Sequence, residues 1–343
     1  MRSILIKNII SILFNIANAA KESAYKTKRN LAKVFTFHRI GPSSSCFNST
    51  IIISKILFLE ILEYIRCKYD IITPFQLCEL ARNNTSRRLA LITFDDGYMD
   101  IFNNAFPILQ QLSIPFTVFL TSGALDRGYT DWDRLDYSLI KMVGRTLDLS
   151  KVGISQIEVR QESISTLHSI LHQALKKVGN ELRLEIITEI ERQAQILPLE
   201  RTMLTWDQVR IMNDSGLAFF GAHTVTHPIL TQISTIKARE EITGCRDRLH
   251  AELGFQPRLF AYPNGRAGDY NEKIISILKD EGFSMAFTTV PGIITSDIDW
   301  FEVNRFDVTQ ENCVSTKGNL FPPRLELETS SIWNALLRAV GRR

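Results

Sequence analysis

Two adjacent acidic residues and a pair of histidines have the types and spacing of a metal site that activates water. Asp95 and Asp96 repel each other unless a cation or a proton relieves the charge. His223 and His227 are separated by three residues, a spacing at which two imidazoles can bind one ion. One aspartate and both histidines would supply three ligands and leave positions for water and substrate, as in catalytic zinc sites. The other carboxylate could then accept a proton from the water.

The positions of these groups in the chain matter more than their types. Asp-Asp-Gly alone is a common turn, and an isolated histidine pair often only caps or packs. Here Asp95 follows one predicted strand, His223 follows a second, and a turn at 262–265 follows a third. Active sites of parallel-strand barrels collect at the C-terminal ends of the strands. We therefore expect the three segments to meet in space.

The rest of the chain alternates between strand-like and helix-like patterns. Short apolar runs that end in polar or turn residues predict buried strands at 32–37, 89–94, 116–121, 217–222, 258–261 and 285–289. Apolar residues at helical spacing predict helices at 56–68, 101–112, 238–253 and 271–281, the last two followed by a glycine. This alternation indicates an α/β fold, a parallel sheet or barrel with helices outside.

One stretch departs from the alternation and is expected to be an insertion. Residues from about 145 to 200 are rich in Leu, Ile, Gln, Glu and Arg and predict helices without strands between them. A lid, a groove wall and structural padding are equally compatible with it. The expected organisation is an N-terminal segment at 1–30, a main domain at 31–312 that carries the insertion, and a C-terminal tail at 313–343.

The composition is ordinary for a globular protein and argues against a nucleic-acid partner. Of 343 residues, 45% are hydrophobic and 22% are charged, and the net charge is only +3. No basic stripe interleaved with aromatic residues stands out. The five cysteines are irregularly spaced and include no CxxC pair, so neither a disulfide framework nor a thiolate zinc site is expected.

Both chain ends place apolar residues beside basic ones and leave the compartment open. Ala17-Asn18-Ala19, after an apolar run, is compatible with signal-peptidase cleavage, but the run is too short to cross a bilayer. Amphipathic helices at both ends, packed on the protein or touching a membrane surface, fit as well. A cytoplasmic or membrane-peripheral location is favoured, and a secreted or periplasmic one is the alternative if the N-terminus is a signal peptide. The sequence gives no oligomeric state.

Three segments in a fixed order resemble the signature motifs of one enzyme family. They are Thr93-Phe94-Asp95-Asp96-Gly97-Tyr98, His223-Thr224-Val225-Thr226-His227-Pro228 and Phe260-Ala261-Tyr262-Pro263-Asn264-Gly265. They resemble the motifs of NodB-type polysaccharide deacetylases, carbohydrate esterase family 4, over about residues 35 to 308. The resemblance implies a distorted (β/α)7-type barrel with a helical insertion.

The resemblance also implies roles for the polar residues. Asp95 matches the family's catalytic base, and Asp96, His223 and His227 match its metal ligands. The backbone N–H of Tyr262 matches a group that helps the metal to stabilise the oxyanion of the tetrahedral intermediate. The implied cofactor is a divalent metal ion, with zinc expected and cobalt, nickel or manganese as alternatives.

A histidine after the first strand is the expected general acid. The segment Phe37-His38-Arg39-Ile40 resembles the Tyr-His-x-Val/Ile segment of the poly-N-acetylglucosamine deacetylase branch, in which the histidine protonates the leaving amine. An imidazole with a pKa of roughly 6.5 suits that role. A hydrogen-bonded core histidine is the alternative for His38. His168, His172 and His250 lie in helical patterns and are expected at the surface.

The sequence departs from the family at one contact of the base. Many members have an arginine at the position of Ala261, where it contacts the base carboxylate, although members with the Phe-Ala-Tyr-Pro pattern lack it. Arg305 could be a site residue or a salt-bridge partner elsewhere. The other candidates for the sugar groove, whose aromatic members could equally pack in the core, are Trp132, Asp133, Trp206 and Pro263.

The expected function is metal-dependent removal of N-acetyl groups from an acetylated glycan or amino sugar. One alternative is an esterase for O-acetylated polysaccharide, because the same chemistry attacks either acyl group. The other is a non-catalytic carbohydrate-binding descendant. The presence of three ligands and an adjacent acid argues against the latter.

Overall fold

A computed structural model describes residues 32–42, 51–82, 88–150, 155–176, 178–195, 199–295, 297–315 and 318–330. The N-terminal segment predicted at 1–30 and the amphipathic helix predicted near the C-terminus lie outside these residues. Within them, no helix has both the length and the apolar character needed to span a bilayer.

A parallel sheet forms the centre of the fold. Its strand order is β11 (Met285–Phe287), β10 (Leu259–Ala261), β9 (Ala218–Ala222), β6 (Phe116–Leu120), β5 (Leu89–Phe94), β1 (Ala32–Phe37) and β12 (Phe306–Asp307), and β4 (Asp70–Ile71) also pairs with β5. The pairings between these strands are parallel. Because both faces are covered, the strands are almost continuously apolar and buried. All six predicted strands are confirmed.

A short segment joins the two ends of this strand order. Val303 forms a parallel bridge with Phe287 of β11. A few residues later, Phe306 of β12 pairs with Phe35 of β1. The segment therefore touches both edge strands and bends the sheet into the expected distorted (β/α) barrel.

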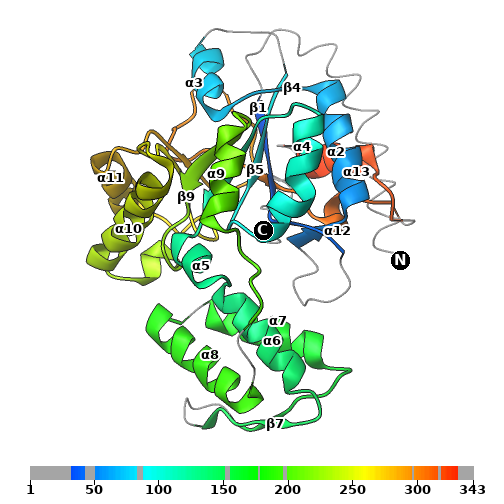
Figure 1. Ribbon diagram of the computed structural model, residues 1–343, viewed down its shortest axis with the longest axis vertical. Coiled ribbons are helices and arrows are strands. Elements are labelled where there is room, and N and C mark those ends of the chain that lie inside the picture. The colour runs from blue at the N-terminus through cyan, green and yellow to red at the C-terminus, as the bar shows by residue number, and fades with distance from the viewer. Residues whose placement is uncertain are drawn as a thin grey trace.

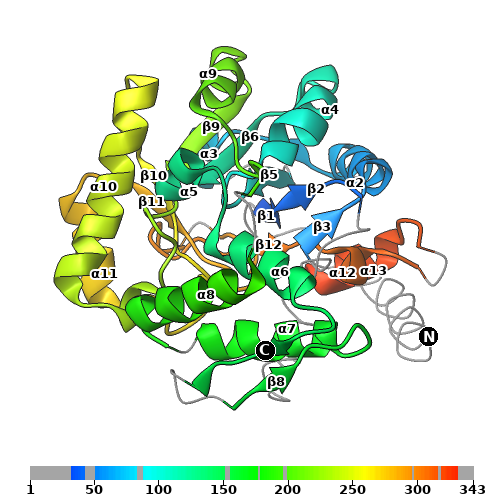
Figure 2. The ribbon, with the colours of Figure 1, turned by 60° about the horizontal axis from the view of Figure 1, so that its bottom comes forward.

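Helices surround the sheet (Figures 1 and 2). They are α2 (Lys55–Lys68), α3 (Pro74–Arg82), the π-helical turn η2 (Ile101–Ala105) continued by α4 (Phe106–Gln111), α5 (Ser122–Arg127), α9 (Trp206–Asp214), the 3-10 turn η4 (Leu230–Gln232), α10 (Thr235–Leu253), α11 (Glu272–Asp280), α12 (Gln310–Cys313) and α13 (Pro322–Glu328). The four predicted helices are confirmed. Their ends follow local signals: the Ser234 side chain accepts from the N–H of Lys237 at the start of α10, and Gly254 ends α10 with φ 74°.

The described part of the C-terminal tail packs on the barrel. Glu326 of α13 accepts hydrogen bonds from Lys33 Nζ (2.9 Å) and from the Tyr64 hydroxyl (3.0 Å). Burial alone raises the pKa of Glu326, but the charge of Lys33 together with the hydrogen bonds from Lys33 and Tyr64 outweighs it and holds this pKa below its usual range. Residues 318–330, which belong to the predicted C-terminal tail, thus pack on the main domain, and Leu325 is part of its apolar core.

The insertion is a small subdomain beyond one end of the sheet. It contains α6 (Asp131–Lys141), β7 (Thr146–Leu147), β8 (Ile157–Glu158), α7 (Ile164–Leu175) and α8 (Asn180–Ala194), and it has its own apolar core. Figure 1 shows it past the end of the sheet at which α5 begins, which is the C-terminal end of β6.

Two expectations for the insertion were wrong. It contains an antiparallel pair, β7 with β8, whose strands of two residues each are too short to leave a periodic signal. His168 is buried rather than at the surface, because its Nε2 lies 2.7 Å from Asp136 Oδ1 inside the subdomain.

Candidate active site

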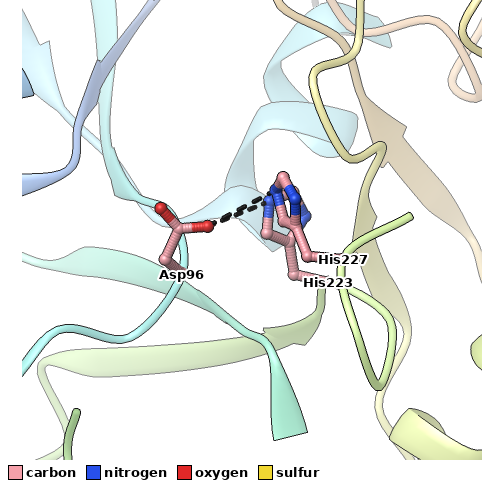
Figure 3. Close-up of side chains that lie close together, drawn as sticks. All are labelled: Asp96, His223 and His227. Carbon is pink, nitrogen blue, oxygen red and sulfur yellow. Dashed lines mark ion pairs between the residues drawn. The ribbon is translucent and has the colours of Figure 1, made fainter. Parts of the chain in front are cut away.

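The three predicted metal ligands meet at the C-terminal ends of β5 and β9. Asp96 Oδ1 lies 3.7 Å from His223 Nε2 and 3.5 Å from His227 Nε2. Atoms bound tetrahedrally at about 2.0–2.1 Å to one zinc ion lie about 3.3–3.4 Å apart, so little movement separates this arrangement from a bound state. Figure 3 shows the carboxylate of Asp96 facing both imidazoles. This is the cluster of potential metal ligands that stands out among the described residues, and its donors fit zinc.

Unusual backbone conformations aim these side chains. Asp96, Thr224 and His227 have positive φ values of 70°, 65° and 58°, and Asn264, in the third motif, has 57°. Such conformations cost free energy for residues other than glycine and cluster at functional sites. These four are among six non-glycine residues with positive φ in the described structure, so this unusual conformation is concentrated in the three motif loops.

The two imidazoles are prepared for binding a cation. His223 Nδ1 lies 2.7 Å from the carbonyl oxygen of Ala261, which fixes Nδ1 as the donor and leaves Nε2 as a ligand. Burial, followed by the charges of His223, Arg183 and Lys176, lowers the pKa of His227. The neutral imidazole, which is the form that binds metal, is thereby favoured.

The carboxylate of Glu241, on α10, holds the loop between the two histidines. It accepts from the N–H groups of Val225 and Thr226, both at 2.8 Å, and from the Thr226 hydroxyl at 2.6 Å. Next to this loop, the N–H of His227 donates to Thr224 Oγ1 at 3.0 Å. Glu241 therefore fixes the loop that carries His223 and His227, although it is not itself a metal ligand.

Glu241→Ala is expected to weaken zinc binding about 10- to 100-fold, because residues that orient metal ligands contribute on that scale. Competition with a chromophoric chelator measures the affinity. Glu240→Ala, at the exposed neighbouring position, is the matched control and should leave it unchanged. Equal affinity for both variants would mean that the loop holds its shape without Glu241.

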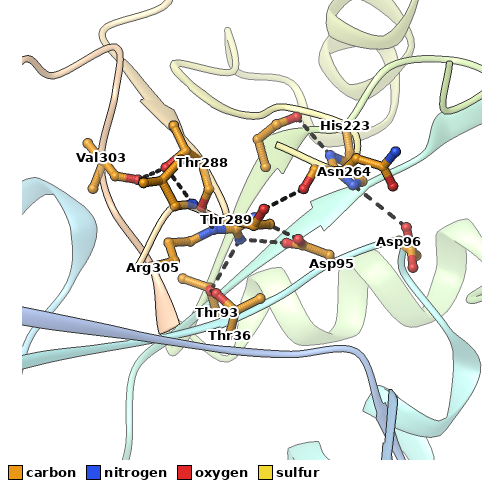
Figure 4. Close-up of polar contacts among 12 residues, drawn as sticks. Thr36, Thr93, Asp95, Asp96, His223, Asn264, Thr288, Thr289, Val303 and Arg305 are labelled. Atoms are coloured by element: carbon orange, nitrogen blue, oxygen red, sulfur yellow. Dashed lines mark hydrogen bonds and ion pairs between the residues drawn. The ribbon is translucent and has the colours of Figure 1, made fainter. Parts of the chain in front are cut away.

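Asp95 lies beside the triad in a buried ion pair with Arg305. The guanidinium donates from Nη1 to Oδ1 and from Nη2 to Oδ2, both at 2.7 Å, and Asp95 and Arg305 are 2% and 0% exposed. Arg305 Nε donates to the carbonyl oxygen of Thr288 at 2.7 Å, and its Nη1 also reaches the Thr93 hydroxyl (Figure 4). The hydrogen bonds to Thr288 and Thr93 thus hold the guanidinium in the orientation in which it binds the Asp95 carboxylate with two parallel hydrogen bonds.

The two adjacent carboxylates have opposite pKa shifts. Burial alone raises the pKa of Asp95, but the charge of Arg305, helped by His223, outweighs it and holds this pKa well below its usual range. Burial raises the pKa of Asp96, and the negative charge of Asp95 adds to that effect. A bound cation would favour ionised Asp96, since an ion is the largest local charge in such a site.

Arg305 makes the arginine contact to the base carboxylate that is missing at Ala261. Ala261 ends β10, whereas Arg305 comes from the segment that joins β11 to β12, and Figure 4 shows its side chain reaching Asp95. The sequence named Arg305 as a groove candidate but did not indicate its partner, which is 210 positions away.

His38 follows β1 at the same end of the sheet. It is partly exposed, and its charge acts on both Asp95 and Asp96, lowering the pKa of each. Its neighbour Arg39 pairs with Asp100 at 2.7 Å instead. His38 therefore lies close enough for its charge to act on both carboxylates, and part of it is accessible from outside the protein.

The backbone N–H of Tyr262, which the resemblance assigns to the oxyanion, already has a hydrogen-bond partner within the sheet. Its backbone N–H donates to the carbonyl oxygen of Phe287 at 3.0 Å, in the ladder between β10 and β11, so it is not a free donor for an oxyanion. The side chain is buried, stacks on Tyr270 at 4.3 Å and donates its hydroxyl hydrogen to the carbonyl oxygen of Phe301. Tyr262 stabilises the barrel wall in this conformation.

Three of the other groove candidates have structural contacts instead. Asp133 is buried at the third position of α6, in a capping box with the N-cap residue Thr130, and its Oδ2 accepts from Thr130 and from the Thr202 hydroxyl. Trp206 donates from Nε1 to Asp126 and packs against Arg248, which ties α9 to α5 and α10. Pro263 is buried, and its carbonyl oxygen accepts from the N–H of Gly265 in a tight turn. Trp132, by contrast, is partly buried on the insertion, where its ring packs against His172 and lies under Lys176 and Arg183.

A cavity of about 620 Å³ opens beside the loop of the histidines. It lies between the start of α8 and α10, and Glu181, Val225, Pro228 and Lys237 are among the residues that line it. None of the three metal ligands lines it, so it is a neighbour of the metal site and not its entrance.

Comparison with known proteins gives concordant matches. A curated relative from Bacillus subtilis (strain 168), named "Putative polysaccharide deacetylase YxkH", is 20% identical over 243 residues. That alignment covers 70% of this chain and 60% of the length of the relative.

Solved structures share the fold. Streptococcus pyogenes deacetylase PplD in complex with acetate has a TM-score of 0.57 at 19% identity, covering 88% of this chain and 100% of that one. IcaB from Ammonifex degensii has a TM-score of 0.57 at 22% identity, covering 88% and 98%. The sequence profile described as polysaccharide deacetylase matches residues 82–286, which is more than half of the chain. The chain therefore belongs to the polysaccharide deacetylase family.

Proposed function

We propose that the protein removes N-acetyl groups from an N-acetylated glycan or amino sugar in a reaction that depends on a divalent metal ion. The observation that supports this most is the meeting of Asp96, His223 and His227 around one position, with ionised Asp95 beside them. Zinc is the expected ion, because one carboxylate and two imidazoles with open positions make a typical catalytic zinc site.

The protein's side chains have separate roles in the proposed reaction. When bound by the triad, the ion would act as a Lewis acid and lower the pKa of water. Asp95 accepts the proton of the attacking water. A carboxylate has about four lone-pair positions and Arg305 uses two of them, so Asp95 keeps the capacity to accept a proton. The Tyr262 N–H has no part in this scheme, because it is bonded to Phe287.

His38 favours an amide substrate over an ester. An amine leaves only after protonation, whereas an alcohol leaves more easily, so an amide hydrolase needs a placed acid. His38 lies where its charge interacts with both carboxylates, and in the proposal it gives its proton to the departing nitrogen as the carbon–nitrogen bond breaks. The products are acetate and a free amino sugar.

Removal of metal by a chelator is expected to reduce acetate release from N-acetylglucosamine oligomers to background. Add-back of zinc, cobalt, nickel or manganese in turn identifies the supporting ion. Zinc should also raise the melting temperature of the metal-free protein, since ligands of the folded state stabilise it. His227→Ala should show neither effect.

The same assays separate the alternatives. An O-acetyl esterase would release acetate from an aryl acetate and from O-acetylated polysaccharide but not from N-acetylglucosamine oligomers. A carbohydrate-binding descendant would bind glycans without releasing acetate at any metal concentration. Activity that survives complete metal removal would refute the metal-dependent scheme.

A further inference from the structure

The pairing of β1 with β5 places His38, the expected proton donor, next to the expected base. Phe37 pairs with Phe94 at the ends of the two strands. The carbonyl oxygen of Phe37 accepts a hydrogen bond from the N–H of Asp95 at 3.0 Å. His38 and Asp95 come next in the chain after these paired residues, so they lie side by side at the C-terminal edge of the sheet.

Alternation along the two strands gives both side chains the same direction. The hydroxyls of Thr36 and Thr93 meet at 3.0 Å, and Arg305 Nη1 reaches the Thr93 hydroxyl at 3.4 Å (Figure 4). Side chains two residues apart along a strand lie on the same face of the sheet. His38 lies two residues after Thr36 and continues this face. Asp95 lies two residues after Thr93 and does the same.

The two residues after His38 are held by side chains from another part of the chain. Asp100 Oδ2 accepts from Arg39 Nε at 2.7 Å, and Asp100 Oδ1 accepts from the backbone N–H of Ile40 at 3.0 Å. The side chains of this ion pair are mostly buried. Asn104 Nδ2 donates to the carbonyl oxygen of Ile40 at 2.5 Å. The segment that follows His38 is therefore fixed through its backbone as well as its side chain.

A π-helical turn presents these two polar side chains together. The turn η2 begins directly after Asp100, and the N–H of Phe106 donates to the carbonyl oxygen of Ile101, five residues earlier. Pro107, at the start of α4, has no N–H and cannot continue the usual helical bonding. Residues four apart, such as Asp100 and Asn104, lie on one face of a helical turn. Turns of the π type are frequent at functional sites.

The loop that leads to Asp100 also carries a metal ligand. Asp96 precedes Asp100 by only four residues. Between them, the N–H of Met99 donates to the carbonyl oxygen of Thr202 at 2.8 Å, which ties the loop to the segment after the insertion. One short loop thus supplies a metal ligand at its start and, at its end, the carboxylate that holds the segment of His38.

Building on the proposed function, we propose that Asp100 is a positioning residue for His38. By binding Arg39 and Ile40, it fixes the imidazole where it can give its proton to the departing nitrogen. A general acid must lie within hydrogen-bond reach of the atom that it protonates. A displacement of about 1 Å can lower a rate about 10²-fold, so a residue that fixes this segment has a large effect without touching the substrate.

Asp100→Asn is expected to lower kcat for acetate release from N-acetylglucosamine oligomers about 10- to 100-fold in the zinc-loaded protein. KM should change little, because the leaving nitrogen is protonated only in the transition state. Turnover of an aryl acetate should also change little, because a phenolate leaves without a proton. Asp280→Asn, at an exposed ion pair with Arg239, is the matched control and should affect neither substrate. An equal loss on both substrates would overturn the proposal.

Removal of His38 shows whether Asp100 acts through it. In the His38→Ala protein the acid is already absent, so adding Asp100→Asn should cause no further loss of amide turnover. Losses that multiply in full would overturn the proposal. If Asp100→Asn fails to fold, Asn104→Ala, which removes only the bond to the Ile40 carbonyl, should give a smaller loss with the same selectivity for the amide.

NMR of the histidine rings separates this inference from the proposed function. The chain has six histidines, and the spectrum of His38→Ala assigns the His38 signal. In the zinc-loaded protein, Asp100→Asn should shift or broaden this signal and leave those of His223 and His227 in place. This result, with no acetate release from N-acetylated substrates by the wild type, would support the role of Asp100 and refute the deacetylase. Acetate release that Asp100→Asn leaves unchanged, with an unchanged His38 signal, would support the deacetylase and overturn the role of Asp100.

Discussion

Asp95→Asn is expected to lower kcat/KM for acetate release about 10²- to 10⁴-fold, because it removes the proposed general base. The amide is nearly the same size as the carboxylate but cannot accept the proton of water. The three metal ligands are unchanged, so zinc affinity should remain close to that of the wild type. Acetate release and chelator competition measure the two properties.

The Asp95→Asn variant also breaks the ion pair with Arg305, so a double variant that removes both charges is needed beside it. Asn at position 95 leaves the guanidinium of Arg305, which is 0% exposed, without an anionic partner. Loss of one partner of a buried pair costs about 3–5 kcal/mol. Asp95→Asn combined with Arg305→Met removes both charges and should recover stability without recovering turnover.

Asp207→Asn, at an exposed position on α9, is the matched control and should keep full activity. If the double variant is well folded, binds zinc and still releases acetate at the wild-type rate, Asp95 is not the base.

The strands and the metal triad could be predicted from the sequence because their signals are local. Each strand is a short apolar run. Asp95 and Asp96 come directly after one of these runs, and His223 comes directly after another, with His227 four residues further on. A parallel arrangement then brings the ends of β5 and β9 to one edge. The positive φ values of Asp96 and His227, which aim the ligands, could not be predicted, since they depend on contacts from elsewhere, such as Glu241.

Several candidate site residues have structural contacts that the sequence analysis did not foresee. The Tyr262 N–H was assigned by resemblance, but its bond to Phe287 exists only once β10 and β11 are paired. Trp206 and Asp133 have the residue types of a sugar groove, yet Asp126 and Thr130 engage them. For Asp133 a local signal was present, because Thr130 three residues earlier forms a capping box with it.

For the insertion, the sequence predicted the helices but not how they pack. Its helices were evident from composition, and its packing was not, because Lys176 and Arg183 reach Trp132 from two other helices. Their position relative to the barrel depends on how the whole subdomain sits beyond the end of the sheet. The sequence therefore left lid, groove wall and padding open.

Arg305→Met is expected to destabilise the metal-free protein by about 3–5 kcal/mol, measured by urea unfolding in the presence of a chelator. The substitution keeps much of the volume but leaves the Asp95 carboxylate buried without its two hydrogen bonds. It also leaves the carbonyl oxygen of Thr288 without the bond from Nε. Arg305→Lys retains one positive charge but lacks the planar fork, so its loss should be smaller than that of the Met variant.

A double-mutant cycle of Asp95→Asn and Arg305→Met isolates the pair from these other losses. If the bidentate contact holds the base in place, the double variant should be more stable than the sum of the single effects predicts, with a coupling energy of about 1–3 kcal/mol. Additive effects would mean that Arg305 acts through Thr288 and Thr93 alone.

Activity gives the second readout: Arg305→Lys should retain more turnover than Arg305→Met, because a nearby cation still favours the ionised carboxylate that the reaction needs. Equal turnover in both would show that the charge of Arg305 does not support the base, and its role would then be confined to closing the barrel between β11 and β12.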